Sequence, residues 1–270
     1  MCGPKCLRGA FSAVVVLIAF ACSKPERVSK PAASEEHVLT TKDGLAISAT
    51  LYTVSEPAPP ALILVHMLGS DRHSWGPFAS RAQKAGYMCA AIDMRGHGDS
   101  ASQGGEKRSY RRFTRGDWYA ALNDIAAAKD LLLRKGAHPE NLAVVGASIG
   151  ANLALHYALE NPDIQAVVLI SPGLDYHGIT TEPEMRSYVK RPSLLVTAEG
   201  DAYAAASCHT LKQIAPGYCD LREYPGAAHG TNLINASDEV VDQILYWLGT
   251  VIGAERQANA NRAVEAKSVE

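Results

Sequence analysis

The segment Gly146-Ala147-Ser148-Ile149-Gly150 places the tightest constraint on the fold of this chain. It matches the pattern G-x-S-x-G and follows an apolar, β-branched run, 141–145, which predicts a strand. The run 151–159 after it predicts a helix. A serine at the tip of so tight a turn is forced into a strained backbone conformation, and small neighbours let the strand and helix approach each other. The pattern therefore predicts an exposed Ser148 hydroxyl beside a helix N-terminus, where backbone N–H groups lack partners.

The composition predicts one domain with a single sizeable core, because the chain has 270 residues, of which 47% are hydrophobic. The net charge of −2 and the pI near 6.5 give no sign of a nucleic-acid surface, and no nucleic-acid partner is expected. The sequence contains no internal repeat, CxxC pair, HExxH motif or phosphate-binding glycine loop. We therefore expect neither a metal site nor a cofactor.

The first 21 residues have the features of an export signal. Lys5 and Arg8 precede an apolar run, Ala10–Ala21, that is short for a membrane span. Cys22 follows it, and the whole segment resembles a bacterial lipoprotein signal, in which the cysteine after the cleavage site receives a lipid. We expect lipid anchoring at Cys22 in the cell envelope, and Ser23 favours the outer membrane. The alternative is an ordinary secretory signal with an incidental cysteine, which gives a periplasmic or secreted protein.

Three further segments complete the expected organisation. Residues 22–36 are rich in proline, serine and charge and predict a disordered tether, 37–252 predict the folded domain, and 253–270 predict a flexible tail. Cys208 and Cys219 lie eleven positions apart, and the sequence leaves open whether they form a disulfide. Cys89 lies between apolar residues and is expected to be buried.

Apolar strands alternate with helices along the domain, which predicts a mostly parallel sheet with helices on both faces. A hairpin turn at Lys42-Asp43-Gly44 adds an antiparallel edge. The expected strands are 37–41, 45–53, 61–66, 87–93, 141–145, 164–170, 193–198 and 218–224, and the expected helices are 75–85, 117–135, 151–159, 202–214 and 237–251.

The segment from Asp93 to Ser100 has the sequence Asp-Met-Arg-Gly-His-Gly-Asp-Ser and matches the pattern Asp-x-Arg-Gly-His-Gly-x-Ser. With the order of elements and the Ser148 motif after the fifth strand, the chain resembles the α/β-hydrolase fold family over residues 37–252. The resemblance implies a serine hydrolase in which the 93–100 segment is structural. Only residues 171–192 connect the sixth and seventh strands, so we expect a minimal cap.

The resemblance implies a catalytic triad in the chain order Ser, Asp, His. The family places its histidine in the loop after the last strand, where this chain has His229, and its acid after the preceding strand, where this chain has Asp201. Asp175 and Glu199 are the competing acids, and Asp175 ranks second because some family members carry the acid one strand earlier. Among the other histidines, His177 lies in a loop and its role stays open.

The resemblance also implies two backbone donors for a developing oxyanion. One is the N–H of Ile149. The other comes from the segment His66-Met67-Leu68-Gly69-Ser70, where the family position corresponds to Leu68 and Met67 is the alternative. His66 is expected to support this loop rather than transfer protons.

Together these residues predict acyl-enzyme hydrolysis of a carboxylic ester or thioester of unknown identity. Two alternatives stay open: an aminopeptidase-like amide hydrolase that uses the same triad, and a lipid-anchored binding protein without turnover. The expected partners are a small acyl ester and, through the lipid, a membrane. The basic segment 101–116 is expected to be solvated beside the site, with recognition of an anionic substrate group as the alternative.

Overall fold

The computed structural model describes residues 34–103 and 106–252. The predicted signal peptide (1–21), the predicted lipidation site Cys22, residues 23–33 of the predicted tether and the predicted tail (253–270) lie outside the described residues. Within the described residues, no helix is both long and apolar enough to cross a membrane.

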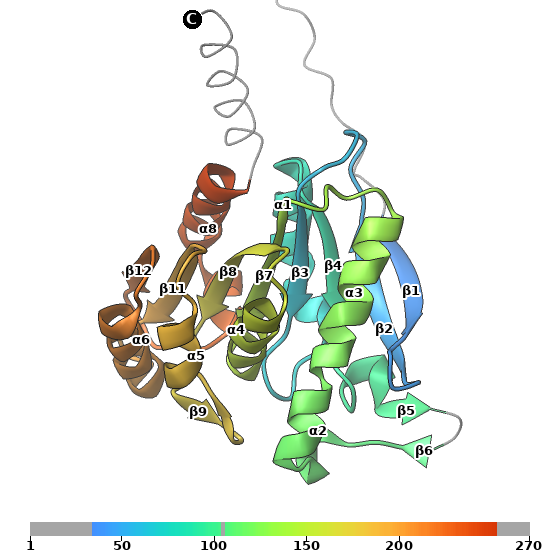
Figure 1. Ribbon diagram of the computed structural model, residues 1–270, viewed down its shortest axis with the longest axis horizontal. Helices are drawn as coiled ribbons and strands as arrows, with labels where there is room; N and C mark the ends of the chain where they lie inside the picture. Colours follow the sequence, from blue (N-terminus) through green and yellow to red (C-terminus); the bar gives the residue numbers. More distant parts are fainter. Residues whose placement is uncertain (1–33, 104–105, 253–270) are drawn as a thin grey trace, which may run out of the picture. The chain divides into compact units, whose positions relative to one another are not determined.

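Eight strands form one sheet in the order β1-β2-β4-β3-β7-β8-β11-β12 (Figure 1). Strand β2 pairs antiparallel with both β1 and β4, and every other neighbouring pair is parallel. This arrangement confirms the predicted mostly parallel sheet with an antiparallel edge. The strands are β1 (Ser34–Thr40), β2 (Ala46–Tyr52), β3 (Ala61–Val65), β4 (Met88–Ile92), β7 (Leu142–Ala147), β8 (Ile164–Ile170), β11 (Ser193–Ala198) and β12 (Cys219–Tyr224).

Helices cover both faces of the sheet, which gives the domain two apolar layers (Figure 1). The central strand β3 contributes side chains to both layers, because successive side chains of a strand point to opposite faces. Its Ile63 joins the layer under α2–α6, whereas Leu62 and Leu64 join the layer under α1, α7 and α8. The helices are α1 (Gly76–Lys84), α2 (Arg115–Ala120), α3 (Leu122–Arg134), α4 (Ile149–Glu160), α5 (Glu182–Ser187), α6 (Ala202–Ile214), α7 (Thr231–Ala236) and α8 (Asp238–Val251).

Short elements fill the connections between these strands and helices. The 3₁₀ turns are η1 (Arg72–Trp75), η2 (Gly98–Ala101) and η3 (Tyr110–Arg112), and two small ladders pair β5 (Ser102–Gln103) with β6 (Glu106–Lys107) and β9 (Asp175–Tyr176) with β10 (Ile179–Thr180). Between β8 and β11 the chain holds only the β9–β10 hairpin and α5, which agrees with the minimal cap that was predicted.

Strand β1 begins at Ser34, so residues 34–36 belong to the sheet and not to the predicted tether. These residues are polar, and their partners come from elsewhere in the fold. Glu36 accepts a hydrogen bond of 2.8 Å from the Thr50 hydroxyl and forms an ion pair with Arg72 at 3.1 Å. Pairing of this kind leaves no signal in the local hydrophobic pattern.

The helix predicted over 117–135 is two helices, α2 and α3, which meet at Ala121. Helix α2 begins earlier than predicted because Thr114 and Asp117 form a reciprocal capping box. At the junction the N–H of Ala121 donates to the carbonyl of Trp118 at 3.0 Å, three residues back, which tightens the turn. Helix α7 was not predicted, because six residues are too few to show a helical period.

The carboxyl ends of the parallel strands gather the loops that carry the predicted site residues. Met67 follows β3, Ser148 follows β7, Asp201 follows β11 and His229 follows β12. Since parallel strands end at the same edge of a sheet, residues that are distant in the sequence meet there.

Candidate active site

Ser148 lies between β7 and α4 in a conformation that few non-glycine residues adopt. Its φ is 55° and its ψ is −122°, outside the regions that L-residues usually occupy. The flanking glycines make this turn possible. A Cβ atom on Gly146 would collide with the carbonyl oxygen of Gly150, and one on Gly150 would lie 2.6 Å from the carbonyl oxygen of His66. The strand, the helix and the end of β3 therefore pack against one another through these two glycines.

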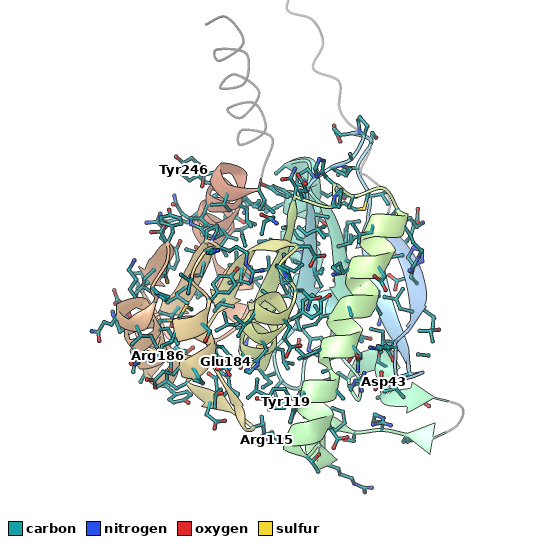
Figure 2. The ribbon with its side chains drawn as sticks, viewed as in Figure 1. Asp43, Arg115, Tyr119, Glu184, Arg186 and Tyr246 are labelled. Atoms are coloured by element: carbon teal, nitrogen blue, oxygen red, sulfur yellow. The ribbon has the colours of Figure 1, made fainter. Side chains whose placement is uncertain are left out.

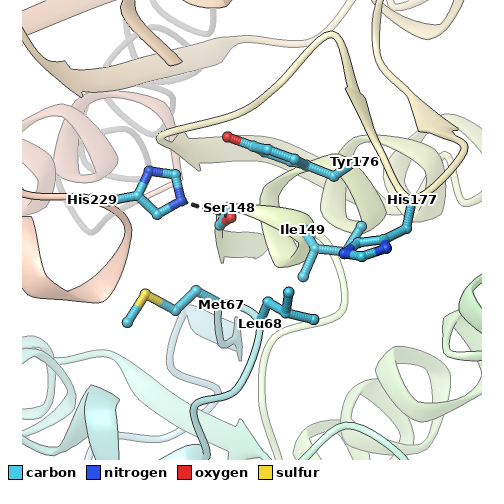
Figure 3. Close-up of a pocket in the computed structure, with 7 residues that line it drawn as sticks. All are labelled: Met67, Leu68, Ser148, Ile149, Tyr176, His177 and His229. Carbon is cyan, nitrogen blue, oxygen red and sulfur yellow. Dashed lines mark hydrogen bonds between the residues drawn. The ribbon is translucent and has the colours of Figure 1, made fainter. Parts of the chain in front are cut away.

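The side chains of Ser148, His229 and Asp201 form a continuous chain of hydrogen bonds. His229 Nδ1 and Asp201 Oδ2 are 2.6 Å apart, and His229 Nε2 and Ser148 Oγ are 2.8 Å apart (Figure 3). A carboxylate can only accept, so Nδ1 carries the proton and Nε2 accepts from the serine hydroxyl. In this tautomer the imidazole is ready to receive the Ser148 proton. The sequence placed these three residues after three different strands, and the fold brings them together.

The two competing acids lie away from this chain of hydrogen bonds. The Oδ1 atom of Asp175 accepts a hydrogen bond of 2.6 Å from the backbone N–H of Gly178 within the β9–β10 hairpin. Glu199 is exposed, and its backbone N–H pairs with the Tyr224 carbonyl. Asp201 is therefore the acid that contacts His229.

The loop that carries His229 is tied to the neighbouring strand. The N–H of Gly230 donates to the Ser171 hydroxyl at 3.0 Å. Gly230 has a φ of 58°, and a Cβ atom at this position would lie 2.8 Å from the sulfur of Met67. Both the backbone conformation and the close approach to Met67 thus call for glycine next to the histidine.

The loop after β3 brings Met67 and Leu68 to the cavity that Ser148 also lines. His66 is buried, its Nδ1–H donates to the Met67 carbonyl at 2.8 Å, and its Nε2 accepts from the Met94 N–H at 3.0 Å. The Ser70 N–H also donates to the Met67 carbonyl, at 3.2 Å. Because C=O and N–H point in opposite directions across a trans peptide, the Leu68 N–H points away from these donors.

His66 thus supports the loop, as predicted, and its ring is held neutral. Burial lowers the pKa of His66 to about 4. Among the described residues, no hydrogen bond uses the N–H of Leu68 or that of Ile149. This geometry favours Leu68 over Met67 as the partner of Ile149 in binding an oxyanion.

A cavity of about 300 Å³ opens over the Ser148 hydroxyl (Figure 3). Most of its lining is apolar. None of the residues that line it is acidic, and they are Met67, Leu68, Ser148, Ile149, Tyr176, His177 and His229. Tyr176 was not identified from the sequence, and His177, whose role was left open, lies in the lining.

Tyr176 and His177 belong to the β9–β10 hairpin, which forms a roof over the cavity. His177 and Gly178 make its turn, with φ values of 55° and 81°, as in the tight turns that connect short hairpins. The buried Asn152 of α4 holds both sides of the hairpin, since its side-chain amide donates to the carbonyls of Gly173 and Ile179 at 3.0 and 2.7 Å. The helix that begins at the nucleophilic turn therefore also fixes the roof.

Neighbouring elements add support to this hairpin. His156 of α4 donates from Nε2 to the Thr180 carbonyl at 2.9 Å. Its ring meets the Tyr119 ring edge to face, with centroids 5.2 Å apart, and its Nε2 lies 3.4 Å from Glu184 Oε1; Tyr119 and Glu184 are labelled in Figure 2. The His177 ring stacks on the buried Trp118, with ring centroids 5.4 Å apart. The hairpin is thus packed between α2, α4 and α5.

The 93–100 segment is structural, as the resemblance implied. The buried carboxylate of Asp93 accepts from the backbone N–H groups of Arg72 and Asp99 at 2.7 and 2.8 Å, and it pairs with the Arg72 guanidinium. A Cβ atom on Gly98 would lie 2.9 Å from the Oδ1 atom of Asp93. None of these residues lines the cavity.

The basic segment flanks the cavity without lining it. The Tyr110 hydroxyl lies 3.0 Å from the position of a Cβ atom on Gly69, and the side chain of Arg115 packs against Gly178. Arg108 approaches Asp117 at 3.9 Å, and Arg111 lies over the ring of Tyr110. No group of three metal-ligating side chains occurs within the part of the chain that the structure describes.

The three described cysteines are free and buried, so the structure contains no disulfide between Cys208 and Cys219. Cys89 is buried between apolar neighbours, as predicted. Burial raises the pKa of all three thiols and makes them unreactive at neutral pH.

Comparison with known proteins identifies relatives in sequence and in structure. Residues 56–196 match the family model described as serine aminopeptidase, S33. The thermostable monoacylglycerol lipase of Bacillus sp. (strain H-257) is 29% identical over 125 residues, which is 46% of this chain and 45% of the lipase. The matched segment thus spans less than half of the length of that relative.

Two solved structures share the fold. The dienelactone hydrolase of Anabaena variabilis has a TM-score of 0.68 at 19% identity, over 83% of this chain and 100% of that one. An esterase from Pyrococcus furiosus has a TM-score of 0.62 at 19% identity, over 82% of this chain and 92% of that one. These similarities confirm the predicted α/β-hydrolase fold.

Proposed function

Because the chain belongs to the serine aminopeptidase S33 family and has the α/β-hydrolase fold, we propose that it is a serine hydrolase that cleaves carboxylic esters through an acyl-enzyme. One observation carries the proposal: the hydrogen-bonded chain from Asp201 through His229 to Ser148 lies at an apolar cavity. A binding protein without turnover has no need of this tautomer-specific geometry.

The reaction follows from the contacts. His229 Nε2 takes the proton of Ser148 while the serine oxygen attacks the acyl carbonyl, and Asp201 stabilises the imidazolium that forms. The N–H groups of Leu68 and Ile149 bind the oxyanion. When the ester C–O bond breaks, its electron pair stays on the alcohol oxygen, which receives the proton from His229. Water, activated by His229, then attacks the acyl-enzyme and releases the acid.

The cavity favours an ester over an aminopeptidase substrate. An aminopeptidase must recognise a protonated α-amino group, for which a carboxylate is the natural partner. None of the residues that line the cavity is acidic, and the carboxylate of Asp201 is already paired with His229. Met67, Leu68 and Ile149 instead offer an apolar surface to an acyl chain.

The name of the Bacillus relative supports monoacylglycerols as the first substrates to test. The purified protein is assayed with monoacylglycerols and p-nitrophenyl esters of several chain lengths, beside aminoacyl anilides. We expect turnover of esters, and we expect Ser148→Ala to lose at least about 10⁴-fold in kcat. Ser74→Ala, a serine outside the cavity, is the control. Cleavage of the anilides in preference to all esters would overturn the proposal.

We also propose that the chain is exported and lipid-anchored through Cys22, which rests on the sequence of the first 22 residues. Metabolic labelling with an alkynyl fatty acid, followed by membrane fractionation, tests this. Cys22→Ser is expected to abolish both labelling and membrane association, whereas Cys6→Ser, within the predicted leader, is expected to change neither. Unchanged membrane association of Cys22→Ser would contradict the anchor.

A further inference from the structure

Tyr176 brings a hydroxyl group to the cavity in addition to that of Ser148. Its hydroxyl lies 3.4 Å from the carbonyl oxygen of Ser171, which is longer than the usual range of about 2.5–3.0 Å for an O–H donor. Tyr176 and Ser148 both line this cavity, and the Tyr176 ring meets the ring of His229, whose Nε2 lies 2.8 Å from Ser148 Oγ. The Tyr176 hydroxyl is therefore weakly bound within the protein and close to the reacting serine.

The phenol stays protonated at neutral pH. Burial raises the pKa of Tyr176, and the negative charge of Asp201 raises it further, while the contact with Ser148 opposes the rise. A neutral phenol is a hydrogen-bond donor. The group therefore has a proton to donate to whatever oxygen lies over Ser148.

The position of Tyr176 indicates which oxygen of a bound ester can accept a hydrogen bond from its hydroxyl. Its ring meets the His229 ring edge to face, with centroids 6.3 Å apart. Figure 3 shows Tyr176 on one side of Ser148, with its hydroxyl end toward His229, and Met67 and Leu68 on the other side. An oxyanion bound to the Leu68 N–H thus faces away from Tyr176. The leaving oxygen, which must lie near His229 to receive its proton, faces Tyr176.

The phenol is also held in place. Gly173 allows Tyr176 and Tyr203 to approach, since a Cβ atom on Gly173 would lie 2.7 Å from one ring and 2.8 Å from the other. The Tyr203 hydroxyl accepts from the Asp175 N–H at 3.0 Å and donates to the Asp175 carbonyl at 3.1 Å. Together with the Asn152 contacts, these interactions orient Tyr176 before a substrate binds.

We propose that the Tyr176 hydroxyl donates a hydrogen bond to the leaving-group oxygen of the ester during acylation, an inference that rests on the proposed function. As the C–O bond breaks, negative charge develops on that oxygen and the His229 Nε2 proton neutralises it. Tyr176 keeps its own proton and stabilises the charge while it develops. The hydroxyl therefore helps esters in proportion to the charge that their leaving oxygen accumulates.

The proposal is tested with Tyr176→Phe, which removes the hydroxyl and keeps the ring. The test is whether the loss of activity in this variant depends on the leaving group of the ester. An alkoxide such as that of glycerol concentrates its charge on oxygen, whereas p-nitrophenolate spreads its charge over the ring. We expect kcat/KM, which reports the acylation half-reaction, to fall about 10- to 100-fold for a monoacylglycerol. For the p-nitrophenyl ester with the same acyl chain we expect a fall of at most about threefold.

Tyr246→Phe is the matched control, because it removes a tyrosine hydroxyl from an exposed position on α8 that neither lines the cavity nor contacts the hairpin. Any loss in this variant is expected to be equal for both esters. Equal losses for both esters in Tyr176→Phe would overturn the inference and leave Tyr176 a structural residue. Absence of ester turnover by the wild type, with Ser148 still labelled by a fluorophosphonate, would instead overturn the proposed ester activity itself.

Discussion

The hydroxyl of Ser171 accepts a hydrogen bond of 3.0 Å from the backbone N–H of Gly230, the residue that follows His229. Ser171 is buried at the end of β8, with a φ of 49°, and its carbonyl oxygen faces the Tyr176 hydroxyl. A single residue after β8 thus contacts both the loop that carries the histidine and the roof over the cavity.

Substitution of Ser171 is expected to impair catalysis through the position of His229. Ser171→Ala leaves the Gly230 N–H without its acceptor, which costs about 1–3 kcal/mol in the free energy of unfolding. We expect kcat/KM to fall about tenfold or more, since small displacements of catalytic groups have large effects on rate. Urea unfolding and ester kinetics measure the two quantities. Ser187→Ala, at an exposed position on α5, is the control. Full activity in a destabilised Ser171→Ala would contradict the positioning role.

Gly150→Ala is expected to destabilise the protein severely, because its Cβ atom would lie 2.6 Å from the backbone oxygen of His66. Backbone cannot move aside as a flexible side chain does, so we expect a loss of about 3 kcal/mol or more. Gly249→Ala provides the same change within helix α8, where the nearest atom is 3.9 Å away. This control is expected to be neutral or to gain about 0.5–1 kcal/mol. Similar unfolding midpoints for the two variants would refute the packing argument.

The buried histidines predict a loss of stability in mild acid. Burial lowers the pKa of both His66 and His97 to about 4, whereas both titrate near 6.5 in the unfolded chain. Below pH 6.5 the unfolded state therefore binds protons that the folded state does not. Their stabilising contribution is complete above pH 6.5 and is lost as the pH falls toward 4, by about 1.4 kcal/mol per pH unit for each histidine.

Unfolding by urea at pH 7 and pH 5 checks this dependence. His97→Gln is expected to reduce the difference in unfolding free energy between the two pH values. His73→Gln, at an exposed position, is expected to leave that difference unchanged. Equal pH dependence in the wild type and in His97→Gln would show that His97 does not contribute.

The identity of the acid is tested by paired substitutions. Asp201→Asn removes the charge that stabilises the His229 imidazolium and favours the wrong tautomer, so we expect kcat to fall by about 10⁴-fold. Asp175→Asn keeps an oxygen that can accept from the Gly178 N–H, and we expect less than about a twofold change. Ester hydrolysis with both variants settles the choice, and a larger loss in Asp175→Asn would reverse it.

The nucleophilic turn was predictable because its constraints are local. Gly146, Ser148 and Gly150 lie within five positions, and the runs on both sides have the length and composition of a strand and a helix. The prediction of His229 and Asp201 as site residues depended on more than a local pattern. It used the order of the strands and the resemblance to the α/β-hydrolase fold. Their contacts with each other and with Ser148 arise from tertiary structure, which no local pattern contains.

The roof of the cavity was not predictable in the same way. Its strands are two residues long, too short to show alternation, and the turn places a histidine where asparagine or glycine is usual. Nothing in the sequence identified Tyr176 as a site residue, because an aromatic residue in a loop between strands is as often part of the packed interior as part of a site. Ser171 is the first residue after a strand, which was the available clue, but its acceptor role depends on a loop 59 positions away.

The attachment of the β9–β10 hairpin to Asn152 also bears on how substrates enter. Because hydrogen bonds from Asn152 tie this roof to the helix behind the nucleophile, we expect the protein to need no opening step at an oil–water interface. Dispersed and micellar molecules of the same ester are then expected to reach Ser148 through the same entrance, so that the fit of the acyl chain determines which esters are cleaved.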